Sequence, residues 1–471
     1  MAIQSTDLTE GSIPRHLVRL AAPLAAGMLF QTMYYMVDLY FVARLGDRAI
    51  AGVAAAGNVQ FIVMSLTQIL GVGTMALIAH AMGRKDRADA NLIFNQSLIL
   101  SGIAAVLTLA GGALLGGRYM NSLGADLATV AAGKTYLAWF LPGLALQFAL
   151  VTMGSALRGT GIVKPTMVVQ VVTVVINAIL APILIAGWGT GRPLGVAGAG
   201  LATSIAVAIG VVLMWYSFAR LEKVVAVDRA LVRPDTKVWA RILRIGLPPG
   251  GEFALMFVSM GTTYWILRGF GAEAQAGYGL GSRVMQAIFL PTMAVAFATA
   301  PLAGQNFGAR KFDRVRATFK AAAVLGTAIM LLVTVMCQWR PEWFFEAFTK
   351  EPPVVAVGAG FLRVVSWNFV ASGLVFTCSG MFQALGNTLP ALVSSAARML
   401  LYAVPGVWLS TRPGFTLERL WWLSFTTVAA QALFSVWLLL RELHRRAPRS
   451  SAEAAAAEDI GVQAAVTLPE G

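Results

Sequence analysis

Charge is the property that this sequence of 471 residues lacks most clearly. Charged residues make up 12% of the chain, whereas a soluble protein carries about 25%. A chain of this length could bury a large core, but it has too few charged residues to cover that core with a water-soluble surface. The two cysteines, Cys337 and Cys378, and three scattered histidines give neither a disulfide framework nor a metal-ligand spacing. These deficits argue against a soluble globular protein, a disulfide-rich domain and a His-based metal site.

Long apolar segments stand where charge is missing. Hydrophobic residues make up 58% of the chain, and the stretches 98–115 and 167–185 contain no charged residue. Because roughly 20 apolar residues span a bilayer, we predict an all-α polytopic membrane protein with 12 transmembrane helices in two pseudo-symmetric six-helix bundles. The predicted helix cores are residues 18–42, 52–80, 94–115, 130–157, 165–187, 195–218, 243–267, 276–303, 318–338, 356–384, 390–409 and 420–440.

Lys and Arg residues gather in every second connection between the predicted helices, and the formal net charge is +14. The connections around Arg84, Arg158, Arg229 and Arg310 are rich in basic residues, whereas the connections between them are poorer and mixed. Basic loops stay in the cytoplasm and meet anionic lipid. We therefore expect a multi-pass protein of a bacterial-type plasma (inner) membrane with both termini cytoplasmic. We expect these basic residues to interact with membrane lipid and not with nucleic acid. We also expect the protein to be a monomer.

The longest charged connection divides the chain into two lobes. We expect a cytoplasmic N-terminal segment at 1–16, an N-lobe at 17–218 and a cytoplasmic linker at 219–239. A C-lobe at 240–442 precedes a cytoplasmic tail at 443–471. The tail is rich in Ala, Ser and Glu and lacks apolar periodicity, which is typical of a disordered segment.

The two lobes align without gaps at an offset of 225 residues. Matched pairs are Arg19 and Arg244, Pro23 and Pro248, Gly46 and Gly271, Gly83 and Gly308, Gly161 and Gly386, and Pro165 and Pro390. Six helices per repeat give both lobes the same topology, so an axis along the membrane normal should relate them. Parallel repeats of this kind suit transport by alternating access, in which two lobes rock around a central site.

Asp38 is a lone acid deep in the first predicted helix. Gln31 and Tyr34 share its helix face because they lie seven and four residues before it. A charged group inside a bilayer is costly unless it faces a cavity or a partner, and no Lys or Arg lies in the middle of an N-lobe helix. We therefore predict that Asp38 binds the coupling ion and that Gln31 and Tyr34 bind substrate. Its counterpart in the second lobe is Thr263, so the lobes are not chemically equivalent.

Polar residues recur on one face of the fifth predicted helix, where Gln170, Thr173 and Asn177 have the same spacing. Thr203 lies in the middle of the sixth predicted helix. We predict that Asn177 and Thr203 complete the ion-coupling site, where oxygen atoms could surround a transported Na⁺ together with Asp38. Gln170 and Thr173 are predicted to bind substrate, although Thr hydroxyls often bond only to their own helix.

Charged residues also lie inside predicted helices of the C-lobe. Glu252 follows a Pro-Pro-Gly-Gly sequence in the seventh helix and is a candidate second coupling acid. It could also bind a cationic substrate or form an ion pair with Arg398 or Arg283. Arg398 and Gln286 are candidate substrate-binding residues.

Four segments together resemble the multidrug and toxic compound extrusion family over about residues 12–442. They are VDLYFVARLG at 37–46, ALRGTG with KPT at 156–166, PLAGQNFGA at 301–309, and QALG with Pro390 at 383–390. The resemblance implies a V-shaped pair of six-helix bundles that exports organic cations in exchange for Na⁺ or H⁺, with no other cofactor. It also implies ion coupling through Asp38, Asn177 and Thr203, which match an aspartate, an asparagine and a threonine of the family.

The sequence departs from the family pattern at two places. A second aspartate often follows the fifth-helix asparagine by one turn, but that position is Ala181 here. The tenth-helix aspartate of some sodium-coupled members is also missing, since residues 368–380 contain no acid. The identity of the ion therefore stays open, and any coupling in the C-lobe falls to Glu252.

A lipid-linked saccharide flippase of the same superfamily is the alternative function. A flippase that handles pyrophosphate should bury Arg and Lys, and their absence from the middle of the N-lobe helices favours the exporter. A membrane-embedded enzyme would need clustered acids or a His/Asp pair at membrane depth. Neither pattern occurs, so we do not expect an enzyme.

Overall fold

The fold is helical throughout the residues that the structure describes. The computed structural model describes residues 7–123, 126–220, 225–346 and 351–446, except for the side chains of residues 31–39, 43, 47 and 272. The elements are α1 (Ile13–Ala43), α2 (Asp47–Gly83), α3 (Arg87–Leu123), α4 (Leu127–Gly159), α5 (Lys164–Ala186), α6 (Val196–Arg220), η1 (Arg229–Leu231), α7 (Thr236–Leu267), η2 (Arg268–Phe270), α8 (Ala272–Gly308), α9 (Phe312–Trp339), α10 (Trp343–Glu346), α11 (Pro352–Val365), η3 (Ser366–Asn368), α12 (Phe369–Ala384), α13 (Leu389–Ser410) and α14 (Leu417–Arg446).

Ten stretches of helix among the described residues are long and apolar enough to cross a membrane. One of them, Pro352–Ala384, combines α11, η3 and α12. The helices α1 and α7 have 31 and 32 residues, which at about 1.5 Å per residue exceeds the hydrocarbon thickness of about 30 Å. With them the predicted set of twelve transmembrane helices is confirmed. The tail was predicted to begin at residue 443, but α14 continues to Arg446. Residues 447–471 lie outside the described part of the chain.

The repeat that the sequence predicts is confirmed in the backbone. The bounds of α2 and α8 differ by 225 residues at both ends, and so do those of α4 and the combined helix Pro352–Ala384. The turns repeat as well. Positive φ angles occur at Gly46 (97°) and Gly271 (90°), at Lys85 (61°) and Arg310 (59°), and at Gly161 (83°) and Gly386 (68°).

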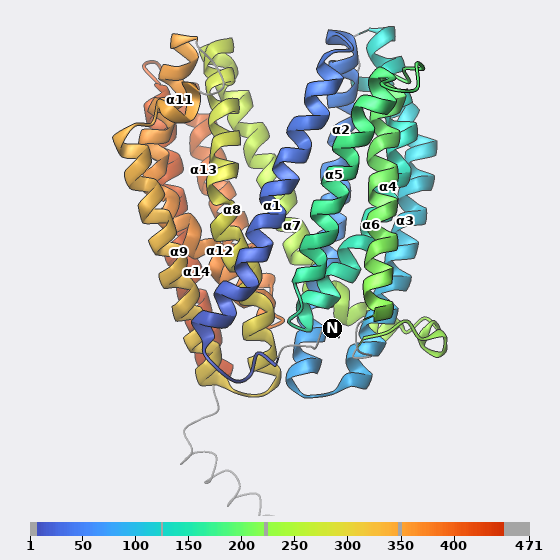
Figure 1. Cartoon of the computed structure of the whole chain (residues 1–471). Helices are drawn as coiled ribbons and strands as arrows, with labels where there is room; N and C mark the ends of the chain where they lie inside the picture. Colours follow the sequence, from blue (N-terminus) through green and yellow to red (C-terminus); the bar gives the residue numbers. More distant parts are fainter. Residues whose placement is uncertain (1–6, 124–125, 221–224, 347–350, 447–471) are drawn as a thin grey trace, which may run out of the picture.

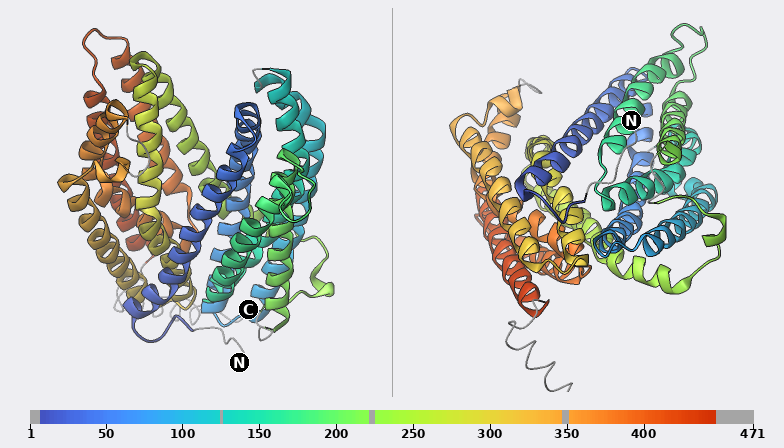
Figure 2. Two further views of the ribbon diagram at one scale, coloured as in Figure 1. Left: turned by 45° about the horizontal axis from the view of Figure 1, so that its top comes forward. Right: turned by 60° about the horizontal axis from the view of Figure 1, so that its bottom comes forward.

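The helices form two bundles, α1–α6 and α7–α14 (Figure 1). We call the end at which α1 begins and α14 ends the basal end, and the opposite end the distal end. The bundles lie close together at the basal end and diverge toward the distal end, as both Figure 1 and Figure 2 show. Each bundle has its own apolar core, one centred on α2 and α4 and the other on α8 and the combined helix α11–α12.

The first helix crosses between the bundles (Figure 1). At its basal start, Leu17 and Leu24 pack in one apolar cluster with Ala294 of α8 and Ala322 of α9, whereas α5 also contacts α1. Its counterpart α7 packs reciprocally against α2. α1 begins at Ile13, before the predicted start of the N-lobe at residue 17, and its first turns bury their apolar face in the second bundle.

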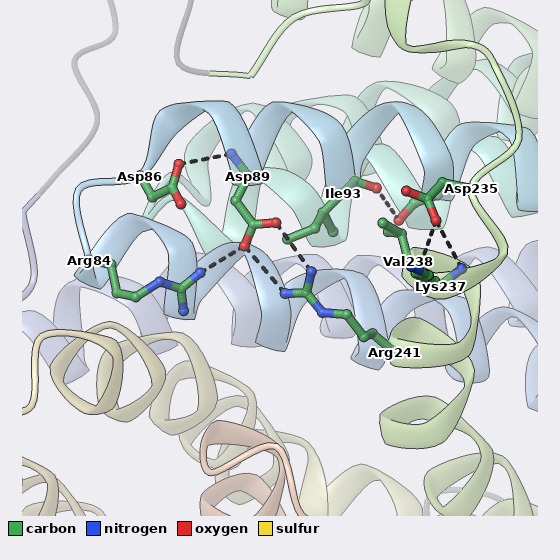
Figure 3. A network of polar contacts seen from close by, with 9 residues as sticks. Arg84, Asp86, Asp89, Ile93, Asp235, Lys237, Val238 and Arg241 are labelled. Carbon is green, nitrogen blue, oxygen red and sulfur yellow. Dashed lines mark hydrogen bonds and ion pairs between the residues drawn. The ribbon is translucent and has the colours of Figure 1, made fainter. Parts of the chain in front are cut away.

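The segment before α7 is held by polar side chains of the first bundle. Asn95 Nδ2 donates to the Ala226 carbonyl at 2.9 Å, and Gln96 Nε2 donates to the Arg233 carbonyl at 2.7 Å. Asp235 then caps α7 by accepting from the Lys237 amide. In Figure 3, Asp89 of α3 lies between Arg84 and Arg241, with ion pairs of 2.7 and 3.3 Å. The linker is therefore shorter than predicted, because α7 already begins at Thr236.

Aromatic side chains paired with arginine occur near both ends of the bundles. Arg44 lies over Tyr40 and Arg412 over Trp408 toward the distal end. Arg220 lies over Tyr216 and Arg441 over Trp437 toward the basal end. Tyr and Trp gather at the two interfaces of a membrane, where an apolar ring and a polar group are both accommodated. These pairs are placed as expected for a protein that crosses the bilayer.

Candidate functional site

The first predicted ion-coupling residue, Asp38, belongs to α1. The structure describes the backbone of α1 there, but the side chains of Asp38, Gln31 and Tyr34 lie outside the described residues. The helix packs against α5 and also touches α6. The backbone therefore brings the helix that carries Asp38 next to the two helices that carry Asn177 and Thr203.

Asn177 of α5 and Thr203 of α6 meet inside the N-lobe. Asn177 Nδ2 donates to Thr203 Oγ1 at 3.4 Å, and both side chains are almost inaccessible, with 0% and 3% of their surface exposed. Thr203 Oγ1 also donates to the Ala199 carbonyl of its own helix. Buried polar groups of this kind persist only when they have partners. The structure therefore places these two residues together, as the sequence predicts, in contact distance of each other and on helices that adjoin α1.

The other polar residues of this region have more local partners. Thr173 Oγ1 donates to the Val169 carbonyl at 2.7 Å, so its hydroxyl is satisfied within α5. Gln170 is partly buried on the same helix. Ser204 accepts from the Gly143 amide and donates to the Trp139 carbonyl. Ser204 therefore joins α6 to α4 and has a structural role.

Glu252 is partly buried on α7 and has an incomplete set of partners. Ser379 Oγ of α12 donates to Glu252 Oε2 at 3.4 Å, while Oε1 is buried without a hydrogen-bond partner among the described residues. Within the same part of the chain, no ion pair joins Glu252 to Arg398 or Arg283. The ion-pair alternative from the sequence is therefore wrong.

The register of α7 against α13 places Glu252 and Arg398 at different depths in the C-lobe. Thr388 Oγ1 donates to the Ile245 carbonyl at the basal start of the two helices. The hydroxyls of Thr263 and Tyr402 are 2.9 Å apart nearer the distal end. The helices thus run side by side in the same direction. Arg398 lies about five residues beyond the level of Glu252, or about 7 Å at 1.5 Å per residue.

Aromatic side chains surround the inner part of the C-lobe near Arg398. Tyr278 of α8 contacts Tyr264 at 5.2 Å between ring centroids and stacks on Trp421 at 5.9 Å. Arg398 Nε is buried without a hydrogen-bond partner in the described part of the chain. Gln286, the remaining predicted substrate-binding residue, is exposed on α8.

The sequence did not single out the residues that join the two bundles at the basal end. His80 of α2 donates through Nε2 to the Ala384 carbonyl of α12 at 2.6 Å. Gln305 of α8 donates through Nε2 to the Gly159 carbonyl of α4 at 2.9 Å. The two donors lie 225 positions apart in the sequence, and so do the two acceptors. One contact is therefore the pseudo-symmetric copy of the other. The repeat was therefore the signal that could have identified them.

The N-terminal segment strengthens this basal closure. The Leu8 amide donates to Gln305 Oε1 at 3.1 Å, and Asn306 Nδ2 donates to the Leu8 carbonyl at 3.1 Å. Lys311 Nζ donates to the Thr9 carbonyl at 3.0 Å. The Leu8 side chain is only 1% exposed. Gln305 thus contacts the N-terminal segment and the first bundle at the same time.

Two glycines allow the helices α2 and α8 to touch at this closure. A Cβ atom on Gly83 would lie 2.0 Å from the Gln305 carbonyl oxygen, and one on Gly308 would lie 2.2 Å from the His80 carbonyl oxygen. Both distances are far below van der Waals contact. The closure therefore requires a residue without a side chain at both pseudo-symmetric positions.

Two repeated six-helix bundles that meet at one end, diverge at the other and hold polar groups at membrane depth are the architecture of a polytopic membrane transporter. The family model described as MatE matches residues 23–183 and 248–409, one match in each repeat. The chain belongs to this family, whose members are transporters and not enzymes.

Curated relatives carry names of drug exporters. The chain is 25% identical over 407 residues to the probable multidrug resistance protein YoeA of Bacillus subtilis, covering 84% of this chain and 85% of that protein. It is 24% identical over 445 residues to the multidrug export protein MepA of Staphylococcus saprophyticus, covering 92% and 95%. The probable multidrug resistance protein NorM of Thermotoga maritima is 25% identical and is covered over 82% of its length.

Solved structures share the fold. A transporter of the MOP superfamily from Pyrococcus furiosus superposes with a TM-score of 0.88 at 23% identity, covering 94% of this chain and 99% of that chain. A multidrug resistance MATE family transporter described in an outward-facing conformation gives the same TM-score, identity and coverage. At this identity the likeness establishes the fold alone.

Proposed function

We propose that the protein is a secondary active antiporter that exports organic, mostly cationic, drugs or metabolites in exchange for H⁺ or Na⁺. The carrying observation is the buried contact between Asn177 and Thr203 beside α1, the helix of Asp38. A carboxylate, an amide oxygen and a hydroxyl are hard oxygen ligands suited to Na⁺, and a carboxylate alone is suited to H⁺. The names of the curated relatives support export of drugs.

The basal end is the cytoplasmic end in this proposal, as the basic loops favour. The bundles are then closed toward the cytoplasm by His80, Gln305 and the N-terminal segment. Substrate leaves on the opposite side, while the coupling ion enters from there and binds in the N-lobe. Return to the inward-facing state requires the basal contacts to separate. We expect the protein to perform this cycle as a monomer in a bacterial-type inner membrane.

Separate ion gradients test the proposed antiport. The purified protein is reconstituted in liposomes with an imposed ΔpH or an imposed Na⁺ gradient, and transport of a fluorescent organic cation is followed. We expect transport well above that of protein-free liposomes with one of the two gradients, and the effective gradient names the ion. Absence of transport with both gradients, in liposomes whose protein is correctly folded by circular dichroism, would contradict the proposal.

Ala181 tests the composition of the N-lobe site. It is fully buried on α5, one helical turn after Asn177. Placing a carboxylate there in Ala181→Asp should add an ion ligand and shift the pH or Na⁺ dependence of transport by about tenfold in ion concentration, since a shift of one pKa unit corresponds to tenfold. The matched control is Ala181→Asn, which adds a side chain of the same size at the same buried position without a charge and should shift the ion dependence far less. An unaltered ion dependence in active Ala181→Asp would show that this position lies outside the site.

A further inference from the structure

The segment of residues 7–12, which precedes α1, is attached to the second bundle through its backbone. The Leu8 amide donates to Gln305 Oε1 at 3.1 Å. The Leu8 carbonyl accepts from Asn306 Nδ2 at 3.1 Å and from Arg314 Nη2 at 3.3 Å. A segment outside helices must find partners for its buried backbone groups elsewhere. Here side chains of α8 and α9 supply them, so the attachment depends on particular residues of the second bundle.

The Leu8 side chain is buried in a space that both bundles border. It is 1% exposed and lies in one apolar cluster with Val163, which precedes α5 in the first bundle, and with Leu302 of α8 in the second. In Figure 1 the segment runs from the start of α1 along the basal end toward the first bundle. A side chain that fills a space between two bundles loses part of its burial when the bundles separate. The burial of Leu8 therefore depends on basal closure.

The charge of Asp7 acts on both bundles as well. Asp7 interacts electrostatically with Lys311, in the turn between α8 and α9, and with Lys85, in the turn between α2 and α3. Lys311 also holds the Thr9 carbonyl through its Nζ atom at 3.0 Å. Opposite charges attract across such a gap, although salt weakens the attraction because Asp7 is exposed. The carboxylate thus adds to the attraction between the two turns.

The amide group of Gln305 connects the segment directly to the contact between the bundles. Its Oε1 atom accepts from the Leu8 amide, while its Nε2 atom donates to the Gly159 carbonyl of α4 at 2.9 Å. Both hydrogen bonds require one orientation of the same planar group, so each bond supports the other. Loss of the segment would leave Gln305 less well oriented toward the first bundle.

We propose that residues 7–12 form a latch that docks while the basal end is closed and leaves when it opens. The latch then sets the balance between the two conformations, which goes beyond the proposed ion and substrate exchange but rests on its alternating access. Linkage makes the effect reciprocal, because docking favours closure by the same factor by which closure favours docking. A change at Leu8 should therefore alter a distance between helices that Leu8 does not itself join.

Leu8→Asp tests the first half of this reciprocity. Spin labels are placed on Arg87→Cys of α3 and Arg316→Cys of α9, both exposed at the basal end, in the purified full-length protein with its native cysteines replaced by serine. We expect the ratio of basally open to closed molecules, read from the distance distribution, to rise about tenfold or more when the buried leucine is lost. Leu8→Met, which conserves volume, and Glu10→Ala, at an exposed position, should change this ratio less than twofold.

A spin label at Glu10→Cys tests the second half, because its mobility reports whether the segment is docked. Gly83→Ala places a methyl group 2.0 Å from the Gln305 carbonyl oxygen and should open the basal end, whereas a methyl group at Gly57 would meet nothing within 4 Å. We expect the label to become mobile in Gly83→Ala and to stay immobile in Gly57→Ala.

Two results would overturn the latch. One is an unchanged distance distribution in Leu8→Asp. The other is a Glu10 label that stays immobile in molecules whose basal distance has increased, since the segment would then belong to the second bundle in both conformations. Neither result bears on the antiport itself, which the gradient experiment in liposomes tests separately.

Discussion

Asp38→Asn should reduce ion-driven transport to the level of protein-free liposomes. The substitution keeps the size of the side chain but removes the acid of the predicted N-lobe coupling site, which Asp38 forms with Asn177 and Thr203. Without a group that changes charge or binds a cation, a gradient of H⁺ or Na⁺ has no differential affinity to act on. The measurement is dye transport in proteoliposomes with the effective gradient imposed, together with the melting temperature of the purified variant.

Asp126→Asn is the matched control for Asp38→Asn. Asp126 is an exposed acid of the same lobe that caps α4, where the Thr129 amide donates to it at 2.7 Å. This hydrogen bond lowers the pKa of its carboxyl. Asparagine caps helices about as well as aspartate, so transport should persist in this variant. Gradient-driven transport by Asp38→Asn at the wild-type rate would refute the coupling role of Asp38.

Gly83→Ala should open the basal end of the protein. The added methyl group would meet the Gln305 carbonyl oxygen at 2.0 Å, and neither backbone can move without separating α2 from α8. Overpacking of this kind costs about 1–3 kcal/mol, which shifts a two-state equilibrium about 5- to 150-fold. Alanine is also the better helix former, so a loss of closure would not arise from a weaker helix.

Spin labels on the two bundles measure this opening. Arg87→Cys on α3 and Arg316→Cys on α9 are exposed at the basal end, and the buried native cysteines Cys337 and Cys378 are replaced by serine. We expect the distance between the labels to increase in Gly83→Ala, and transport to fall at least fivefold. Gly57→Ala provides the control on the same helix, because a Cβ atom there would meet nothing within 4 Å. An unchanged distance distribution in Gly83→Ala would contradict the proposed steric role.

The basal contacts show how a repeat in sequence becomes a closure in space. His80 and Gln305 are different residues at equivalent positions, yet each donates to the backbone carbonyl at the equivalent position of the opposite repeat, that of Ala384 or Gly159. The acceptors are backbone atoms, which every sequence supplies, so substitution of the donor changes the strength of the contact without changing its position. The glycines at positions 83 and 308 are identical because steric exclusion, unlike hydrogen bonding, allows one solution here.

The sequence predicted the fold class, the number of membrane helices and the repeat, because these depend on local properties. Apolar length decides whether a helix spans a bilayer, and Gly or Pro marks the turns. The sequence also predicted that Asn177 and Thr203 belong together. The roles of Asp38, Gln31 and Tyr34 stay predictions, since their side chains lie outside the described residues.

Only the tertiary structure decided which charged side chains pair with each other and at what depth in the membrane region each one lies. Sequence could not exclude an ion pair between Glu252 and Arg398, because their separation depends on the register between α7 and α13. It also placed α1 from residue 17 onward in the first lobe, whereas Leu17 and Leu24 pack against α8 and α9. The periodicity of a helix defines which face is apolar but not which bundle covers that face. The physical reason is that composition and spacing act along the chain, while charge pairing and interface packing depend on distances between segments far apart in it.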